Sequence, residues 1–212
     1  MQNSFRLDGK IALITGGTGA LGTTMVRTLA DAGATVIIVG RNETTTTELA
    51  EEINDAGGNA VGFSADVLDI EAVKLLAETV KERFGRVDIL LNGAGGNRPD
   101  ATAVPGERSF FDLPPDAMRW VFDLNLMGTI LPSQIFGAMM AEQGSGNIIN
   151  ISSMASMQPL TRVVAYAAAK AAINNFTQWL AVTLATEHNH AIRVNAIAPG
   201  FFIGAQNRFL LL

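Results

Sequence analysis

The sequence predicts an α/β domain built on one doubly wound parallel sheet, and two features of the pattern support this. Short runs rich in Val and Ile alternate with longer amphipathic segments, an order typical of strand and helix units whose sheet is covered on both faces. Several of the longer segments end at glycines, namely Gly33, Gly57 and Gly85, as helix C-caps do. Right-handed connections then give a Rossmann-type, three-layer α/β/α fold with ligands beyond the carboxyl ends of the strands.

The elements follow in order along the chain. The expected strands cover residues 11–15, 35–39, 60–64, 87–91, 147–151 and 192–198. The expected helices cover residues 21–31, 44–55, 70–84, 115–142 and 163–187. No linker divides the 212 residues, so we expect one domain. Residues 93–114 lack a periodic pattern and follow the fourth strand, where we expect them to form a wall of the substrate site.

Composition excludes several kinds of chemistry. Without cysteine, the chain has no disulfide, thiolate nucleophile or thiolate metal site. Its two histidines, His188 and His190, lie in a polar patch that looks like a helix end, so we expect no metal site. A net charge of -5 without a Lys/Arg cluster argues against nucleic acid and anionic lipid as partners. With neither a signal peptide nor a run of about 18 apolar residues, we expect a cytoplasmic protein that crosses no membrane.

A glycine-rich turn joins the first strand to the first helix and reads Thr15-Gly16-Gly17-Thr18-Gly19-Ala20-Leu21-Gly22. Glycines permit a tight turn and close backbone approach, and a helix N-terminus offers free N–H groups to a pyrophosphate. We therefore predict dinucleotide binding here, with a merely structural turn as the alternative. The expected contacts are Gly16, Thr18, Gly19, Ala20, Leu21 and Gly22.

The end of the second strand bears on the choice of dinucleotide. Many dinucleotide-binding folds place a carboxylate there for the ribose hydroxyls, whereas this chain has Gly40, Arg41 and Asn42. The glycine removes repulsion toward a 2′-phosphate, and the Arg41 guanidinium can pair with one. We expect Arg41 and Asn42 to contact the cofactor and NADP(H) to be favoured over NAD(H). Arginine stacked on adenine, or simply solvated, is the alternative.

Tyr166 and Lys170 stand four residues apart on an expected helix, so their Cβ atoms lie about 5–6 Å apart on one face. Lowering the pKa of a phenol from about 10 to about 7 requires roughly 4 kcal/mol. One cation at about 4 Å, with an effective dielectric near 20, contributes about that much. We therefore predict that Lys170 lowers the pKa of Tyr166 and makes it a proton-transferring group. The alternative is a packing tyrosine on an Ala-rich helix.

Over nearly its whole length the chain resembles the short-chain dehydrogenase/reductase family, in its shorter, single-domain class. Besides the glycine turn and the Tyr166/Lys170 pair, the resemblance rests on Asp66-Val67, Asn92-Gly93-Ala94-Gly95, Asn125, Ser153 and Arg193-Val194-Asn195-Ala196-Ile197-Ala198-Pro199-Gly200. The family's serine stands thirteen residues before its tyrosine, which selects Ser153 over Ser152. One departure is Ala20, where most members have glycine; the glycine spacing matches the extended class, while the other motifs fit the shorter one.

The resemblance implies a role for each motif in an NAD(P)-dependent oxidoreductase. Tyr166 is the implied general acid/base, Lys170 holds the nicotinamide ribose, and Ser153 hydrogen-bonds the reacting carbonyl oxygen. Asn125 is implied to hold a water near Lys170. The other implied cofactor contacts are Asp66 and Val67 at the adenine, Asn92, Ala94 and Gly95 at the adenosine and riboses, and Pro199 and Gly200 at the nicotinamide.

Three segments resemble the D-mannonate oxidoreductase (fructuronate reductase) branch, namely residues 93–99, residues 125–129, and residues 199–202 with 206–208. That branch acts in carbohydrate metabolism on a keto-uronate and an aldonate. Asn97, Arg98 and Arg208 are then expected partners of a sugar acid. The alternatives are another keto-sugar, a polyol, a 3-oxoacyl thioester, or a cofactor-binding protein without chemistry. The resemblance also implies a homotetramer, and a substrate lid and last strand that residues 1–212 lack.

Overall fold

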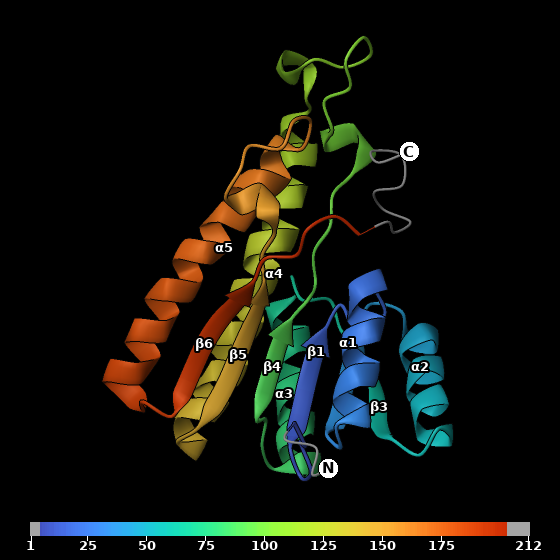
Figure 1. Ribbon diagram of the computed structural model, residues 1–212, viewed down its shortest axis with the longest axis vertical. Helices are drawn as coiled ribbons and strands as arrows, with labels where there is room; N and C mark the ends of the chain where they lie inside the picture. Colours follow the sequence, from blue (N-terminus) through green and yellow to red (C-terminus); the bar gives the residue numbers. More distant parts are fainter. Residues whose placement is uncertain (1–4, 203–212) are drawn as a thin grey trace.

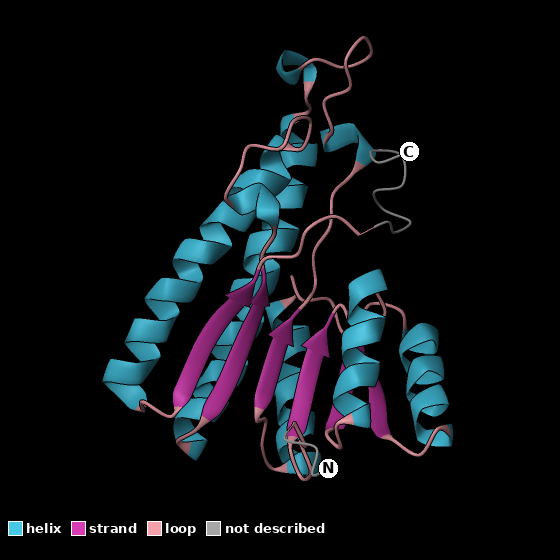
Figure 2. Ribbon diagram, viewed as in Figure 1, coloured by secondary structure: helices cyan, strands magenta, loops and turns pink. Residues whose placement is uncertain are grey.

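The protein folds as one six-stranded parallel sheet between two layers of helices. The computed structural model describes residues 5–202, and its strand order is β3-β2-β1-β4-β5-β6 (Figure 1). The strands are β1 (Ile11–Thr15), β2 (Thr35–Gly40), β3 (Asn59–Ser64), β4 (Ile89–Asn92), β5 (Gly146–Ile151) and β6 (Ile192–Ile197). Every pairing is parallel, so the strands all point to one edge of the sheet, the carboxyl edge (Figure 2). The predicted doubly wound α/β architecture is confirmed.

The helices are α1 (Ala20–Asp31), α2 (Glu43–Asp55), α3 (Ile70–Phe84), α4 (Pro115–Gln143) and α5 (Val164–Thr183), the last continued by a π-helical turn, Leu184–His188. Side chains cap two of them. Asn42 accepts a hydrogen bond from the Thr45 N–H at 3.2 Å at the start of α2, and Asp69 accepts one from the Glu71 N–H at 3.0 Å at the start of α3. Gly85 ends α3 in the left-handed region, at φ 76°.

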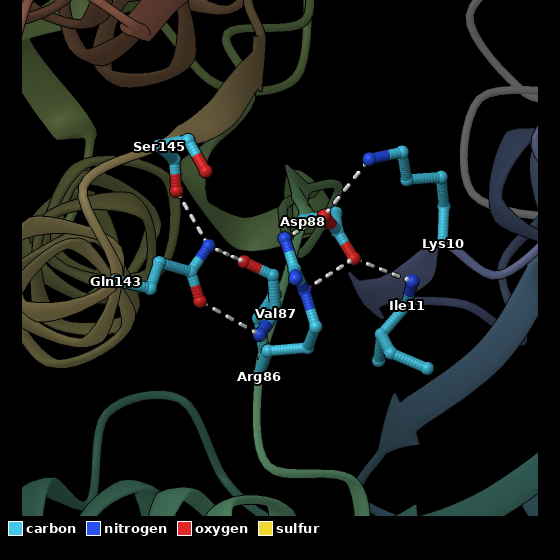
Figure 3. A network of polar contacts seen from close by, with 7 residues as sticks. All are labelled: Lys10, Ile11, Arg86, Val87, Asp88, Gln143 and Ser145. Carbon is cyan, nitrogen blue, oxygen red and sulfur yellow. Dashed lines mark hydrogen bonds and ion pairs between the residues drawn. The ribbon is translucent and has the colours of Figure 1, made fainter.

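One predicted strand begins later than expected. β4 starts at Ile89, although the apolar pattern begins at Val87. The side chain of Gln143, at the end of α4, donates to the Val87 carbonyl at 2.7 Å and accepts from the Val87 N–H at 3.4 Å (Figure 3). Val87 is therefore held by a side chain instead of by a neighbouring strand.

Two apolar clusters hold the layers together, one on each face of the sheet. On one face, Ala12 and Ile14 of β1 pack with residues of α1 and α2 such as Val26. On the other, Leu13 packs with residues of α3, α4 and α5 such as Phe136. Ala12, Leu13 and Ile14 thus point alternately into the two clusters, which is why all three are apolar.

Helix α4 is unusually apolar because it is a core helix. Alone among the described helices it has the length and mean hydropathy, 1.2, of a membrane span, and 44% of its most apolar window is buried inside the fold. It packs against β4, β5, α3 and α5. Its apolar character is accounted for by these contacts.

The segment between β4 and α4 was expected to lack regular structure, and it contains short elements. It has two 3₁₀ turns, Pro99–Ala101 and Phe110–Asp112, and a bridge between Val104 and Arg108. Figure 1 shows it projecting beyond the carboxyl edge. Arg108 Nη1 donates to the Pro99 carbonyl at 2.8 Å and so connects the two ends of the projecting segment.

A buried carboxylate organises the opposite, amino edge of the sheet (Figure 3). Asp88 accepts hydrogen bonds from the Ile11 N–H at 3.0 Å and from Arg86 at 2.6 and 3.1 Å, and Lys10 Nζ lies 3.3 Å away. Burial acts to raise the pKa of Asp88, but the hydrogen bonds from Ile11, Arg86 and Lys10 hold it below its ordinary value.

Candidate active site

The carboxyl ends of β1 and β4 lie side by side. From β1 the chain continues to β2 on one side, and from β4 it continues to β5 on the other side. Thr15 pairs with Asn92, the last residue of β4. The Gly93 N–H donates to the Thr15 carbonyl at 3.1 Å, and the Ala94 N–H donates to Thr15 Oγ1 at 3.3 Å. In a sheet of this strand order, such a reversal opens a crevice in which ligands bind.

The glycine turn beside this crevice has space only for glycine at two positions. Gly16 has φ 65°, and a Cβ there would lie 2.7 Å from the Gly93 carbonyl oxygen. A Cβ on Gly22 would lie 2.1 Å from the Gly16 oxygen. No described side chain caps α1 and its first turn holds no acidic residue, unlike α2 and α3. The free N–H groups at its start fit the pyrophosphate of a dinucleotide.

The expected adenosine contacts lie where the neighbouring strands end. Arg41 is exposed, and no hydrogen bond or ion pair engages its guanidinium within the described residues. Asn42 caps α2, so its side-chain oxygen already has a partner. Asp66 is exposed and accepts from the Leu68 N–H at 3.0 Å, and Val67 is buried.

Asn92 lies below the crevice, inside a buried polar network. Its Nδ2 donates to Ser133 Oγ on α4 at 2.9 Å and to Asn150 Oδ1 on β5 at 2.8 Å. Asn150 Nδ2 in turn donates to Thr177 Oγ1 on α5 at 2.9 Å. The side chain of Asn92 thus joins strands to helices, and its expected contact with the cofactor stays a prediction.

Three of the four predicted catalytic side chains, Ser153, Tyr166 and Lys170, converge from two elements, and Asn125 is the fourth. Tyr166 and Lys170 lie on α5, and Lys170 Nζ stands 5.5 Å from the centroid of the Tyr166 ring. Ser153 begins a short 3₁₀ turn after β5, and its side chain hydrogen-bonds Tyr166. Lys170 is 3% exposed and donates to the Ile151 carbonyl at 2.7 Å. A proton donor, a second hydroxyl and a buried cation therefore share one site.

The direction of the Tyr166 pKa differs from the prediction. Burial raises the pKa of Tyr166, and the hydrogen bond from Ser153 lowers it by less. Lys170 was expected to lower it, but its ammonium is directed at a carbonyl, and burial lowers the pKa of Lys170 itself to about 8. The loss of solvation at the phenol therefore outweighs the hydrogen bond from Ser153, and the pKa of Tyr166 lies above its ordinary value.

Asn125 reaches the same place from α4. It is fully buried; its Nδ2 donates to the Gly96 carbonyl at 2.7 Å, and its Oδ1 accepts from the Gly96 N–H at 3.2 Å. A Cβ on Gly95 would lie 2.7 Å from Asn125 Oδ1 and 3.3 Å from Lys170 Nζ. Asn125 therefore holds the segment that passes over Lys170, and its water-binding role stays a prediction.

The residues expected to meet the substrate are partly engaged elsewhere. Arg98 forms a two-point ion pair with Asp100, at 2.6 and 2.8 Å, and stacks on Trp120. Asn97 donates to Thr102 Oγ1 at 2.8 Å. Arg208 lies outside the described residues. A substrate carboxylate at Arg98 would have to compete with Asp100.

The remaining expected positions lie after β6 and at the end of α5. The Pro199 carbonyl accepts from the Met154 N–H at 3.1 Å, next to Ser153, and Gly200 is exposed. His188 and His190 are exposed. Within residues 5–202, no group of three or more His, Cys, Asp or Glu side chains could hold a metal ion.

A family model described as short chain dehydrogenase matches residues 10–208. The chain belongs to the short-chain dehydrogenase family. It is 46% identical to the uncharacterized oxidoreductase UxuB of Bacillus subtilis, over 97% of this chain and 76% of the relative. Its relatives and the cradle at α1 identify it as an NAD(P)-dependent oxidoreductase.

Two crystal structures similar to this short-chain dehydrogenase carry dinucleotides. One, assigned as a D-mannonate oxidoreductase from Haemophilus influenzae with bound NAD, is 41% identical with a TM-score of 0.89, over 98% of this chain and 76% of that one. The other, a gluconate 5-dehydrogenase from Burkholderia cenocepacia with NADP and tartrate, is 34% identical with a TM-score of 0.88, over 98% and 77%.

Two side chains at the site were missed by the sequence reasoning. Ser156 and Asn174 form hydrogen bonds around Ser153, described below. The available signal was spacing, because Asn174 stands four residues beyond Lys170, as Lys170 stands four beyond Tyr166.

Proposed function

We propose that this short-chain dehydrogenase interconverts the ketone of a sugar acid and the matching secondary alcohol, with D-fructuronate and D-mannonate as the pair. The convergence of Ser153, Tyr166 and Lys170 at the carboxyl edge carries the chemistry. Likeness to structures assigned as a D-mannonate oxidoreductase and a gluconate 5-dehydrogenase supports the sugar-acid class.

In the reducing direction, the Tyr166 hydroxyl donates its proton to the carbonyl oxygen, and the Ser153 hydroxyl donates a hydrogen bond to the same oxygen. When bound, the nicotinamide supplies the hydride to the carbonyl carbon. The ammonium of Lys170, 5.5 Å from the ring centroid, stabilises the phenolate that remains. In oxidation, the phenolate takes the proton of the alcohol.

Steady-state kinetics tests the substrate assignment. We expect kcat/KM for D-fructuronate to exceed that for uncharged ketones of similar size by about 100-fold or more, as a site with placed polar partners should. Turnover no better than with those ketones would overturn the assignment while leaving the dehydrogenase chemistry intact.

A second substrate class is favoured by two side chains beside Ser153. Met154 and Met157 are exposed, at 36% and 60%, on the turn that follows the serine. An apolar substrate such as a 3-oxoacyl thioester would cover them. A kcat/KM for such a thioester above that for D-fructuronate would select this class.

We also propose that NADP(H) is preferred over NAD(H). A Cβ on Gly40 would lie 3.1 Å from Thr46 and 3.2 Å from Thr18, so a carboxylate at this position would need its neighbours to move. The exposed guanidinium of Arg41 is placed to meet a 2′-phosphate. Arg41→Ala is expected to weaken NADPH binding about tenfold and leave NADH binding unchanged. Equal losses for both, by fluorescence titration, would contradict this.

A homotetramer is the proposed assembly. The outer face of α5 exposes Trp179 at 60% and Val182 at 65%, and such apolar residues favour burial against another subunit. Light scattering is expected to give four copies, and Trp179→Glu to give fewer. A monomeric parent protein would contradict the proposal.

A further inference from the structure

Helix α5 carries three polar side chains in one line. Tyr166, Lys170 and Asn174 stand at intervals of four residues, so they follow one face of the helix. The first two belong to the proposed proton transfer. Asn174 is half-buried and lies one turn further from Tyr166.

Asn174 connects α5 to the turn that holds Ser153. Its Oδ1 accepts from Ser152 Oγ at 2.6 Å, and its Nδ2 donates to Ser156 Oγ at 2.8 Å. Ser156 Oγ then donates to the Ser153 carbonyl at 2.6 Å, which also accepts the Ser156 N–H at 2.9 Å. The amide therefore bonds the residue before Ser153 and the residue three after it.

The Ser153 Oγ itself accepts from the Ala155 N–H within the turn at 3.1 Å, so its hydrogen can be donated toward the reacting oxygen. Ser152 is 1% exposed and its hydroxyl is committed to Asn174, with the Lys170 carbonyl 3.2 Å away. The turn Met154–Ser156 is only three residues long, and so short a 3₁₀ turn contributes little rigidity of its own. Its link to Asn174 sets where Ser153 stands relative to Tyr166, because Asn174 and Tyr166 lie on the same helix.

We infer that Asn174 is a positioning residue, which fixes the Ser153 hydroxyl against Tyr166 through Ser156. The inference rests on the proposed roles of Ser153 and Tyr166. Without the amide, Ser152 and Ser156 on either side of Ser153 both lose their hydrogen bonds to Asn174, and the Ser153 hydroxyl can shift. A displacement of about 1 Å in a reacting group costs up to about 100-fold in rate.

A double-mutant cycle on Ser153 and Asn174 tests this. Ser153→Ala is expected to lower kcat about 100-fold, as removal of a donor to the reacting oxygen does. Asn174→Ala is expected to lower kcat about tenfold with the KM for the dinucleotide unchanged. The double variant should be no slower than Ser153→Ala, because Asn174 acts only through the serine.

The controls separate positioning from general damage. Asn175→Ala removes the same type of side chain one residue along, at an exposed position, and kcat should stay within about twofold. Ser156→Ala breaks the same link without altering α5 and should reproduce the loss of Asn174→Ala. Ser156→Thr keeps the hydroxyl and should recover most of it. The comparison of Ser156→Ala with Ser156→Thr tests the positioning role even if Asn174→Ala fails to fold.

The outcomes are distinct. A double variant with the same kcat as Ser153→Ala supports the inference. A double variant whose fall in kcat is the product of the two single falls overturns it, and so does a Ser156→Ala enzyme as fast as the parent. If Ser153→Ala alone leaves kcat unchanged, the proposed function is at fault instead.

Discussion

The two edges of the sheet each bury one charged side chain, under opposite conditions. At the amino edge, the carboxylate of Asp88 accepts a backbone N–H and lies beside two cations (Figure 3). At the carboxyl edge, the ammonium of Lys170 donates to one backbone carbonyl, and no carboxylate in the described part of the chain pairs with it. The surrounding groups stabilise the Asp88 carboxylate, whereas burial destabilises the Lys170 ammonium. The buried charge at the amino edge therefore contributes to stability, and the one at the carboxyl edge serves the reaction.

The pH dependence of stability should differ between the edges. The folded pKa of Asp88 lies below its ordinary value, so its contribution is present above about pH 4 and is lost as the pH falls further. The folded pKa of Lys170 is also lowered, from 10.5 to about 8. For a base this means that the folded state binds fewer protons, so stability increases as the pH rises from about 8 toward 10.5.

The largest effect should come from Lys170→Met. It removes the cation that supports the Tyr166 phenolate, and kcat should fall about 1,000-fold. The free energy of unfolding at pH 7 should rise by about 1–3 kcal/mol, since a desolvated charge is replaced by an apolar chain of similar length. Urea denaturation at pH 7 and pH 10 measures this. A variant less stable than its parent at pH 7 would contradict the contrast between the edges.

The reverse result is expected for Asp88→Asn. The amide keeps an acceptor for the Ile11 N–H but loses the charge between Lys10 and Arg86. The free energy of unfolding should fall by about 2 kcal/mol, and kcat should stay within about twofold. Below pH 4 the difference between variant and parent should shrink. A loss of activity with unchanged stability would show that the edges are not separate.

A smaller effect is expected from Gly95→Ala, which places a methyl group 2.7 Å from Asn125 Oδ1 and 3.3 Å from Lys170 Nζ. Crowding there should lower kcat/KM about tenfold. Gly137→Ala is the matched control, because its methyl would meet Ile148 at 3.8 Å, an ordinary contact. Inside α4 it should raise stability by about 0.5–1 kcal/mol without a change in rate. Equal rates for the two variants would show that the crowding at Gly95 is harmless.

The sequence predicted the elements well because both faces of the sheet are buried, which makes the strands continuous apolar runs. Helical spacing also predicted that Tyr166 and Lys170 share one face of α5, and the family resemblance added Ser153 to that pair. It could not predict side-chain partners. Arg98 is paired with Asp100, and Asn42 caps α2, because a local acceptor or N–H is nearer than any ligand.

The pKa of Tyr166 shows the same limit. The four-residue spacing predicted that Lys170 lies near Tyr166. It did not predict the loss of water around the Tyr166 phenol, or that the Ile151 carbonyl accepts a hydrogen bond from the Lys170 ammonium. Desolvation depends on the whole packed environment, which no four-residue pattern encodes.

The most direct test of proton transfer at the carboxyl edge is the kcat of Tyr166→Phe, measured with D-fructuronate and NADPH. The change removes one hydroxyl and keeps the ring, so dinucleotide binding should be retained and the free energy of unfolding should change by no more than about 1 kcal/mol. We predict a fall in kcat of about 1,000-fold. Turnover equal to that of the parent enzyme would show that Tyr166 does not transfer the proton.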